Sequence, residues 1–231
     1  MRVVGVDVGI RHLALVELQC EHELPDASPA LGAMHLVNIM DYTHNRVPEE
    51  HCTLHHTRHL GDRLEHFWQE WAHFFEDADL VAIEQQPVTG LVGVEAFLFA
   101  KCRECVEIVS PTQLHAWAFG KKHGLDYERR KVEMEARAAA LCTRMSADPT
   151  RWDRATRSLP RRHDVADALM IAFFAWQARR ALLWDAPMPT VHAGARVSTH
   201  FGGWPAGEKG ERWRAEVERT ARRRVGRVTP K

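Results

Sequence analysis

The stretch RVVGVDVG, residues 2–9, is a run of valines and glycines that contains a single acid, Asp7. Valine at four of the eight positions is typical of a central strand that is buried on both faces of a sheet. An ionised carboxylate is strongly destabilised in such surroundings unless a cation or hydrogen bonds replace the lost water. The stretch therefore predicts a central strand that carries Asp7 to a functional site.

Three more acids occupy comparable places. Glu84 ends the apolar run LVAIE at residues 80–84, which predicts a second buried strand. Asp164 and Asp167 lie three residues apart in HDVADAL, a spacing that places both carboxylates on one face of a helix. Acids at strand ends and on one helical face are typical of sites that gather around Mg²⁺.

Each acid taken singly also has a structural interpretation. Asp7 is compatible with a turn residue and Glu84 with a cap at a strand end. Asp164 and Asp167 are compatible with a pair favoured by the dipole at a helix N-terminus. The functional interpretation rests on all four acids occurring together in a strand, strand and helix context.

The chain around these acids alternates strand and helix patterns. Expected strands cover 2–9, 12–19, 33–40, 80–84 and 105–109; expected helices cover 59–76, 91–104, a segment beginning at Pro111, 127–143 and 163–183. Between the last two helices, the arginine-rich residues 144–162 are interpreted as a basic, partly mobile loop. We predict one α/β domain over residues 1–183, followed by a Gly/Pro-rich linker and basic C-terminal extension over 184–231.

Composition narrows the class of protein. Of the 231 residues, 45% are hydrophobic, which is enough for a packed core. No apolar stretch approaches the roughly 20 residues that span a bilayer, and the N-terminus lacks the features of a signal peptide. A soluble, intracellular protein with no membrane partner is expected.

The net charge of zero conceals an asymmetry. Residues 1–100 contain 5 Lys and Arg against 16 Asp and Glu, whereas residues 101–231 contain 26 against 15. The C-terminal part is therefore the candidate for phosphate contact, which adds salt-dependent affinity. The DNA-binding candidates are Lys121, Lys122, Arg129, Arg130, Lys131, Arg161 and Arg162.

Five cysteines are scattered along the chain, a pattern that favours reduced thiols over a disulfide framework. Cys102 and Cys105 form a CxxC pair, and a histidine-rich stretch contains Cys52, His55, His56 and His59. A structural zinc site is one interpretation. The alternative is a pair of helix-face cysteines and a solvated polar segment.

The motifs together resemble those of RuvC-type Holliday junction resolvases, and among these the poxvirus-like viral branch. The resemblance rests on DVGIRHLALVEL at 7–18, IEQQ at 83–86, SPTQL at 110–114, KK at 121–122, ERRK at 128–131 and HDVADAL at 163–169. It implies an α/β protein of the RNase H-like fold, with a five-stranded mixed sheet flanked by helices. It covers roughly residues 1–180.

The resemblance also implies an activity: metal-dependent hydrolysis by a homodimer that resolves four-way (Holliday) DNA junctions in recombination and repair. Asp7 would bridge two metal ions, Glu84 would hold one of them, and Asp164 and Asp167 would supply the remaining catalytic ligands. Mg²⁺ is the expected cofactor, with Mn²⁺ as a substitute. The products would be a 5′-phosphate and a 3′-hydroxyl. For a viral protein, the place of action would be the site of viral DNA replication in the infected cell.

A catalytically dead junction-binding protein is one rival interpretation, against which the four retained acids argue, and two rival enzyme functions remain open from the sequence. One is an RNase H-fold nuclease with another substrate, such as a transposase or a flap or RNA endonuclease. The other is an actin-like ATP-binding phosphotransferase, which also uses a DxG motif near the start. The phosphotransferase would need a second Gly-rich phosphate loop, and the sequence shows none.

Overall fold

The structure is a computed structural model that describes residues 1–20, 29–42, 52–120, 124–146, 148 and 150–183. Lys121, Lys122 and the predicted extension at 184–231 lie outside the described residues. Within the described part of the chain, no helix has the length and apolar character needed to cross a membrane.

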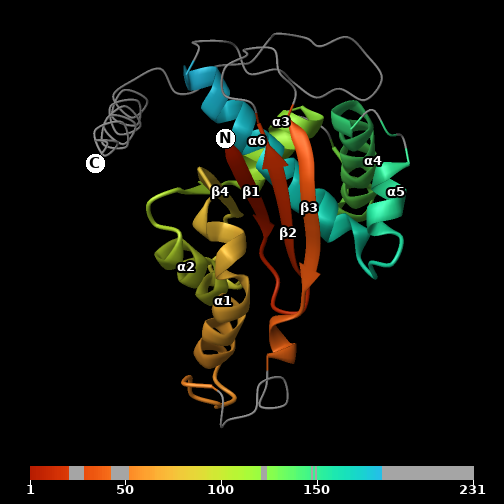
Figure 1. The fold of residues 1–231 in the computed structure, drawn as a ribbon. Coiled ribbons are helices and arrows are strands. Elements are labelled where there is room, and N and C mark those ends of the chain that lie inside the picture. The colour runs from red at the N-terminus through yellow and green to blue at the C-terminus, as the bar shows by residue number, and fades with distance from the viewer. Residues whose placement is uncertain (21–28, 43–51, 121–123, 147, 149, 184–231) are drawn as a thin grey trace, which may run out of the picture.

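A five-stranded mixed sheet forms the centre of the molecule (Figure 1). Its strands are β1 (Arg2–Asp7), β2 (Leu13–Gln19), β3 (Ala30–Val37), β4 (Leu80–Glu84) and β5 (Val106–Val109). They lie in the order β3-β2-β1-β4-β5; β1 pairs antiparallel with β2 and parallel with β4. The mixed sheet predicted from the sequence is thus confirmed, with β1 in its central position.

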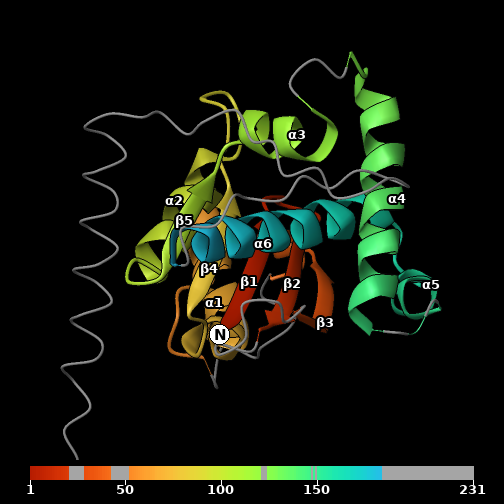
Figure 2. The same cartoon turned by 90° about the horizontal axis from the view of Figure 1, so that it is seen from above.

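Helices cover both faces of this sheet. They are α1 (Leu60–Glu76), α2 (Val92–Lys101), α3 (Pro111–Phe119), α4 (Tyr127–Ser146), α5 (Arg151–Thr156) and α6 (Arg162–Leu183), with a 3₁₀ turn η1 at Ile39–Asp41. One core cluster joins α1 and α2 to the sheet, and a second joins α3, α4 and α6 to the opposite face. Figure 2 shows α6 crossing the strands on that second face, with α4 beside its N-terminal end.

The alternation of side chains along β1 decides where Asp7 points. Val4 and Val6 pack in the core that contains α1, whereas Val3 packs in the core that contains α6. Because successive strand residues face opposite sides, Asp7 shares the α6 face with Val3. On β4, Ala82 belongs to the α6 core and Ile83 to the α1 core, so Glu84 also faces α6.

Gly5 lets α6 lie directly on β1. A Cβ atom at this position would overlap the carbonyl oxygen of Ala168 and would approach the Cβ of Ala172 to 2.7 Å. The strand and the helix therefore touch backbone to backbone, which only glycine permits. This close contact holds the start of α6 over the C-terminal end of β1.

Two expectations about local structure were wrong. The third strand spans Ala30–Val37 rather than 33–40, because Asn38 ends it by accepting a hydrogen bond from Met40 N and starting η1. The segment 144–162 is not simply a loop, since it contains the helix α5. Trp152 on α5 is only 2% exposed, so this short helix is held by packing.

Candidate metal centre

Asp7 and Glu84 are the last residues of β1 and β4, two adjacent parallel strands. Val6 pairs with Ile83, so the two acids follow next in register at the same edge of the sheet. Their carboxyl groups share a hydrogen bond. Gln86 Nε2 also donates to Glu84 Oε2 at 3.1 Å, which orients the glutamate.

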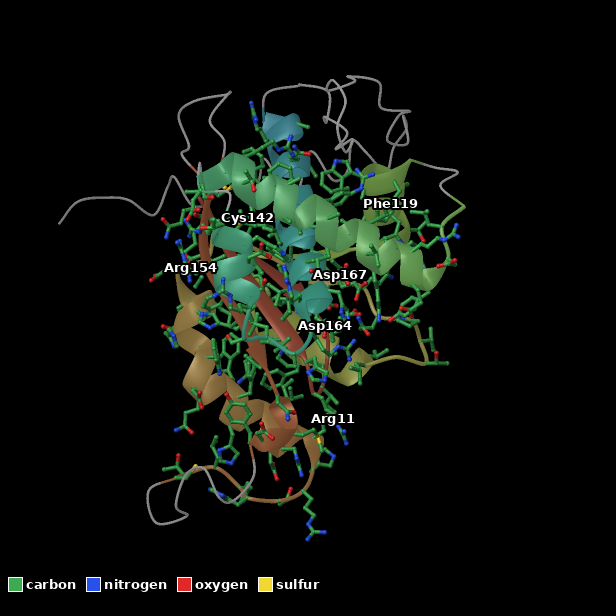
Figure 3. All side chains as sticks on the ribbon, turned by 90° about the vertical axis from the view of Figure 1, so that its right-hand side faces the viewer. Arg11, Phe119, Cys142, Arg154, Asp164 and Asp167 are labelled. Atoms are coloured by element: carbon green, nitrogen blue, oxygen red, sulfur yellow. The ribbon has the colours of Figure 1, made fainter. Side chains whose placement is uncertain are left out.

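Asp164 and Asp167 belong to the first two turns of α6 (Figure 3). The contact between Gly5 and Ala168 places these turns over the strand end that carries Asp7. The charges of Asp167, Glu84 and Asp164 all act on the Asp7 carboxyl. The structure therefore brings together the four acids that the sequence singled out.

Burial and mutual repulsion shift the protonation of these acids. Burial, followed by the neighbouring carboxylates, raises the pKa of Asp7 well above its usual range. Burial also raises the pKa of Glu84, and burial with the charges of Glu84 and Asp164 raises the pKa of Asp167 to about 8. The raised pKa values of these three carboxyl groups indicate a site that lacks positive charge. A divalent cation with oxygen ligands would supply that charge. The donor set fits Mg²⁺ or Mn²⁺.

The four carboxylates lie near one another, but no three of them bring their oxygen atoms as close together as the ligands of a single metal ion. Among the described residues, no three of them place ligand oxygens all within 4.8 Å of one another. Two oxygens bound to one Mg²⁺ lie at most about 4.2 Å apart, since each Mg–O bond is about 2.1 Å. Binding an ion would therefore draw the side chains inward.

Asp164 is held by basic neighbours. Arg161 Nε lies 2.9 Å from Asp164 Oδ2, and His163 Nε2 lies 3.0 Å from Asp164 Oδ1. Asp164 is 6% exposed and the Arg161 side chain 38%, so the carboxylate is buried while its guanidinium partner reaches solvent. Arg161, predicted to contact DNA, has an intramolecular partner in the centre itself.

The other described DNA-binding candidates surround the start of α4 and α6. Arg130 and Lys131 lie close enough to Asp167 for their charges to lower its pKa against the larger effect of burial. Arg162 pairs with Glu135 and Asp153 at 3.1 and 2.7 Å. Arg129 is more exposed and lies 3.7 Å from Asp126.

Two neighbouring residues were missed by sequence reasoning. Glu95, in the first turn of α2, accepts a hydrogen bond from the backbone N–H of Gln86 and so anchors the segment after Glu84. Tyr127 is 57% exposed, and Lys131 Nζ lies 4.2 Å from the centre of its ring. A Glu in the first turn of a helix and a Tyr at the start of a helix are both common, so neither residue indicates a functional site in a single sequence.

The pKa of Asp167 predicts how the metal-free protein responds to pH. The pKa is raised in the folded state from an ordinary value of 3.8 to about 8, so the folded chain binds the extra proton. Stability should therefore fall as pH rises from about 4 to about 8 and then level off. With chelator present, Asp167→Asn should raise stability at pH 8.5 by about 1–3 kcal/mol and change little at pH 4.5.

Thermal melts of both proteins at the two pH values check this expectation. Asp77→Asn, an exposed acid just after α1, is the matched control and should show no such pH-dependent gain. Saturating Mg²⁺ should stabilise the unaltered protein at pH 8.5 more than the Asp167→Asn variant. A variant that melts lower than the unaltered chain at pH 8.5 without metal would contradict the assigned repulsion.

Comparison with known proteins supports the architecture. No family model and no curated protein matches the sequence. The structure is similar to the fowlpox virus resolvase in complex with its substrate Holliday junction DNA, at 12% identity, covering 78% of this chain and 99% of that one, with a TM-score of 0.55. A second structure of the fowlpox virus Holliday junction resolvase gives 12% identity, 77% and 99% coverage, and a TM-score of 0.52.

The Thermus thermophilus RuvC structure is 19% identical, with coverage of 78% of this chain and 96% of that one and a TM-score of 0.48. The two fowlpox virus comparisons show that the chain shares its fold with a resolvase. The RNase H-like fold expected from the sequence is thereby confirmed.

Proposed function

We propose that this chain is a RuvC-type endonuclease that resolves four-way DNA junctions by metal-dependent hydrolysis. The observation that carries the proposal is the meeting of Asp7 and Glu84, from adjacent parallel strands, with Asp164 and Asp167 from α6. The shared fold with a resolvase supports the same assignment.

The chain's own residues define the chemistry. Asp7 would be the central ligand, because it touches Glu84 and feels the charges of both helix acids. Glu84, Asp164 and Asp167 would complete the oxygen ligands. When bound, Mg²⁺ would offset the charge of the scissile phosphate and activate water for in-line attack. Arg161 and His163 would keep Asp164 oriented during this step.

The first two turns of α4 are the proposed contact for the DNA backbone beside the centre. Arg130 and Lys131 bring positive charge toward Asp167, and the exposed ring of Tyr127 lies under Lys131. Phosphate contacts by such residues position DNA without reading its sequence. An aromatic ring next to them offers a surface on which an unpaired base can stack.

A homodimer is the proposed acting form. A four-way junction has approximate two-fold symmetry, and two coordinated nicks need two centres related by the same symmetry. Each chain carries a single set of the four acids, so one chain supplies one centre.

A substrate panel tests the function. The purified protein should nick a labelled four-way junction in paired, symmetric positions with Mg²⁺ or Mn²⁺, and should be inactive with chelator. Flap, linear duplex and RNA–DNA hybrid substrates should be cut at least about tenfold more slowly, a discrimination of about 1.4 kcal/mol. Faster cutting of the hybrid or the flap would favour the rival nucleases. Metal-dependent ATP consumption without DNA cutting would favour the phosphotransferase.

A further inference from the structure

A second set of metal-ligating side chains lies apart from the carboxylates. Among the described residues, one group of three or more Cys, His, Asp or Glu side chains places its ligand atoms all within 4.8 Å of one another. It consists of Cys52, His56 and His66. We propose that these residues form a zinc site that fastens segment 52–59 to α1.

Local contacts hold Cys52, His56 and His66 close together. Cys52 and His56 lie on the segment that leads into α1, and His66 lies in the second turn of α1. Thr57 N donates to Asp62 Oδ2 at 3.2 Å, which ties the segment to the first turn of the helix. His59 Nδ1 accepts from Gly61 N at 3.1 Å and caps the same helix.

The distances suit a tetrahedral zinc ion. Cys52 Sγ lies 3.8 Å from His66 Nδ1. Two ligands on one zinc ion, with bonds of about 2.3 Å to sulfur and 2.05 Å to nitrogen, are about 3.6 Å apart at the tetrahedral angle. The His56 and His66 rings lie edge to face with centroids 4.7 Å apart, and both ring nitrogens of His56 are shielded from solvent.

The outer contacts of His66 select the tautomer that a metal needs. His66 Nε2 lies 3.3 Å from the carbonyl oxygen of His55. A ring N–H that donates to this oxygen leaves the lone pair of Nδ1 directed at Cys52 Sγ. Metal-bound histidines commonly donate their second ring N–H to a backbone carbonyl in this way.

The ligand chemistry distinguishes this site from the carboxylate centre. One thiolate and two imidazoles favour zinc, whereas Mg²⁺ requires oxygen ligands. The two sites share no residue, so each can be removed without altering the ligands of the other. With three protein ligands, a water molecule would complete the zinc coordination.

Cys102 and Cys105, the pair suggested by the CxxC motif, are not part of this group. Cys102 is 5% exposed, and burial raises the pKa of its thiol to about 12. Cys105 Sγ lies 3.5 Å from the carbonyl oxygen of Cys102. Cys105 therefore serves as the control cysteine in a test of the zinc site.

Metal analysis of tag-free, full-length protein tests the proposal. After dialysis against a weak chelator, the protein should retain about one zinc per chain. Cys52→Ser and His66→Gln should each weaken zinc affinity at least about 100-fold, because losing even an outer-shell partner weakens metal sites 10–100-fold. Cys105→Ser, and His73→Gln on an exposed part of α1, should retain the zinc.

Cobalt substitution gives a second measurement that does not depend on stability. Co²⁺ added to the metal-free protein should produce a near-ultraviolet band from thiolate-to-metal charge transfer. The band should vanish in Cys52→Ser and persist in both Cys105→Ser and Asp7→Asn, which separates this site from the carboxylate centre. Zinc that is lost on dialysis, or a band unchanged in Cys52→Ser, would overturn the proposal and leave an ordinary thiol–imidazole hydrogen bond.

Discussion

Asp7→Asn is expected to lower the rate of junction cleavage by at least about 10³-fold, equivalent to about 4 kcal/mol of transition-state stabilisation. Asp7 is the acid on which the charges of the other three converge, so its loss removes the proposed central ligand. Asparagine keeps the shape of the side chain and one oxygen but lacks the negative charge that binds a divalent ion. Single-turnover cleavage of a labelled junction in Mg²⁺ measures the loss.

The same variant should fold and bind DNA normally. Neutralising Asp7 relieves repulsion among buried acids, so stability without metal should be equal or higher. Junction binding in a gel-shift assay should persist and should weaken steeply as salt rises. Asp77→Asn, exposed at the end of α1, is the matched control and should cleave at the unaltered rate. Undiminished cleavage by Asp7→Asn would remove the basis of the proposed function.

The carboxylate centre was predictable because each acid breaks a pattern that burial imposes. Asp7 interrupts a valine-rich run and Glu84 ends the apolar run of residues 80–83, so both stood out against strands that have little other reason to carry charge. Asp164 and Asp167 were visible through their helical spacing ahead of a long apolar run. Local pattern and tertiary position agree at these residues, and the structure brings them together.

Features that depend on distant contacts were not predictable. The arginines of 144–162 indicated a basic, partly mobile loop, yet Trp152 is buried and Arg162 pairs with Asp153. The proposed zinc site was predicted only in part: the sequence pointed to Cys52 and His56 in the histidine-rich stretch, but also to the CxxC pair Cys102 and Cys105, which lies outside the group. No sequence pattern pointed to His66. Its proposed partners, Cys52 and His56, lie on a segment whose position beside α1 is defined only by the fold.

Gly5→Ala is expected to destabilise the protein by about 3–5 kcal/mol, near the upper end for a single substitution. The new methyl group would overlap the backbone carbonyl of Ala168. This carbonyl belongs to the backbone of α6 and, unlike a side chain, cannot relieve the overlap by changing rotamer. Urea denaturation of the two proteins measures the difference. Gly93→Ala is the control, since its Cβ would meet only Leu60 Cδ2 at 3.8 Å, and its stability should be unchanged or slightly higher.

A second substitution separates backbone overlap from side-chain crowding. Ala172→Gly removes the Cβ that lies 2.7 Å from the added methyl but leaves the Ala168 carbonyl in place, so the double variant should recover little stability. Any folded Gly5→Ala protein must hold α6 farther from β1, which draws Asp164 and Asp167 away from Asp7. Its cleavage should therefore fall together with its stability. A free energy of unfolding for Gly5→Ala within about 1 kcal/mol of that of the unaltered chain would be the size of an ordinary surface effect. That result would show that the contact between Gly5 and Ala168 does not position the carboxylate centre.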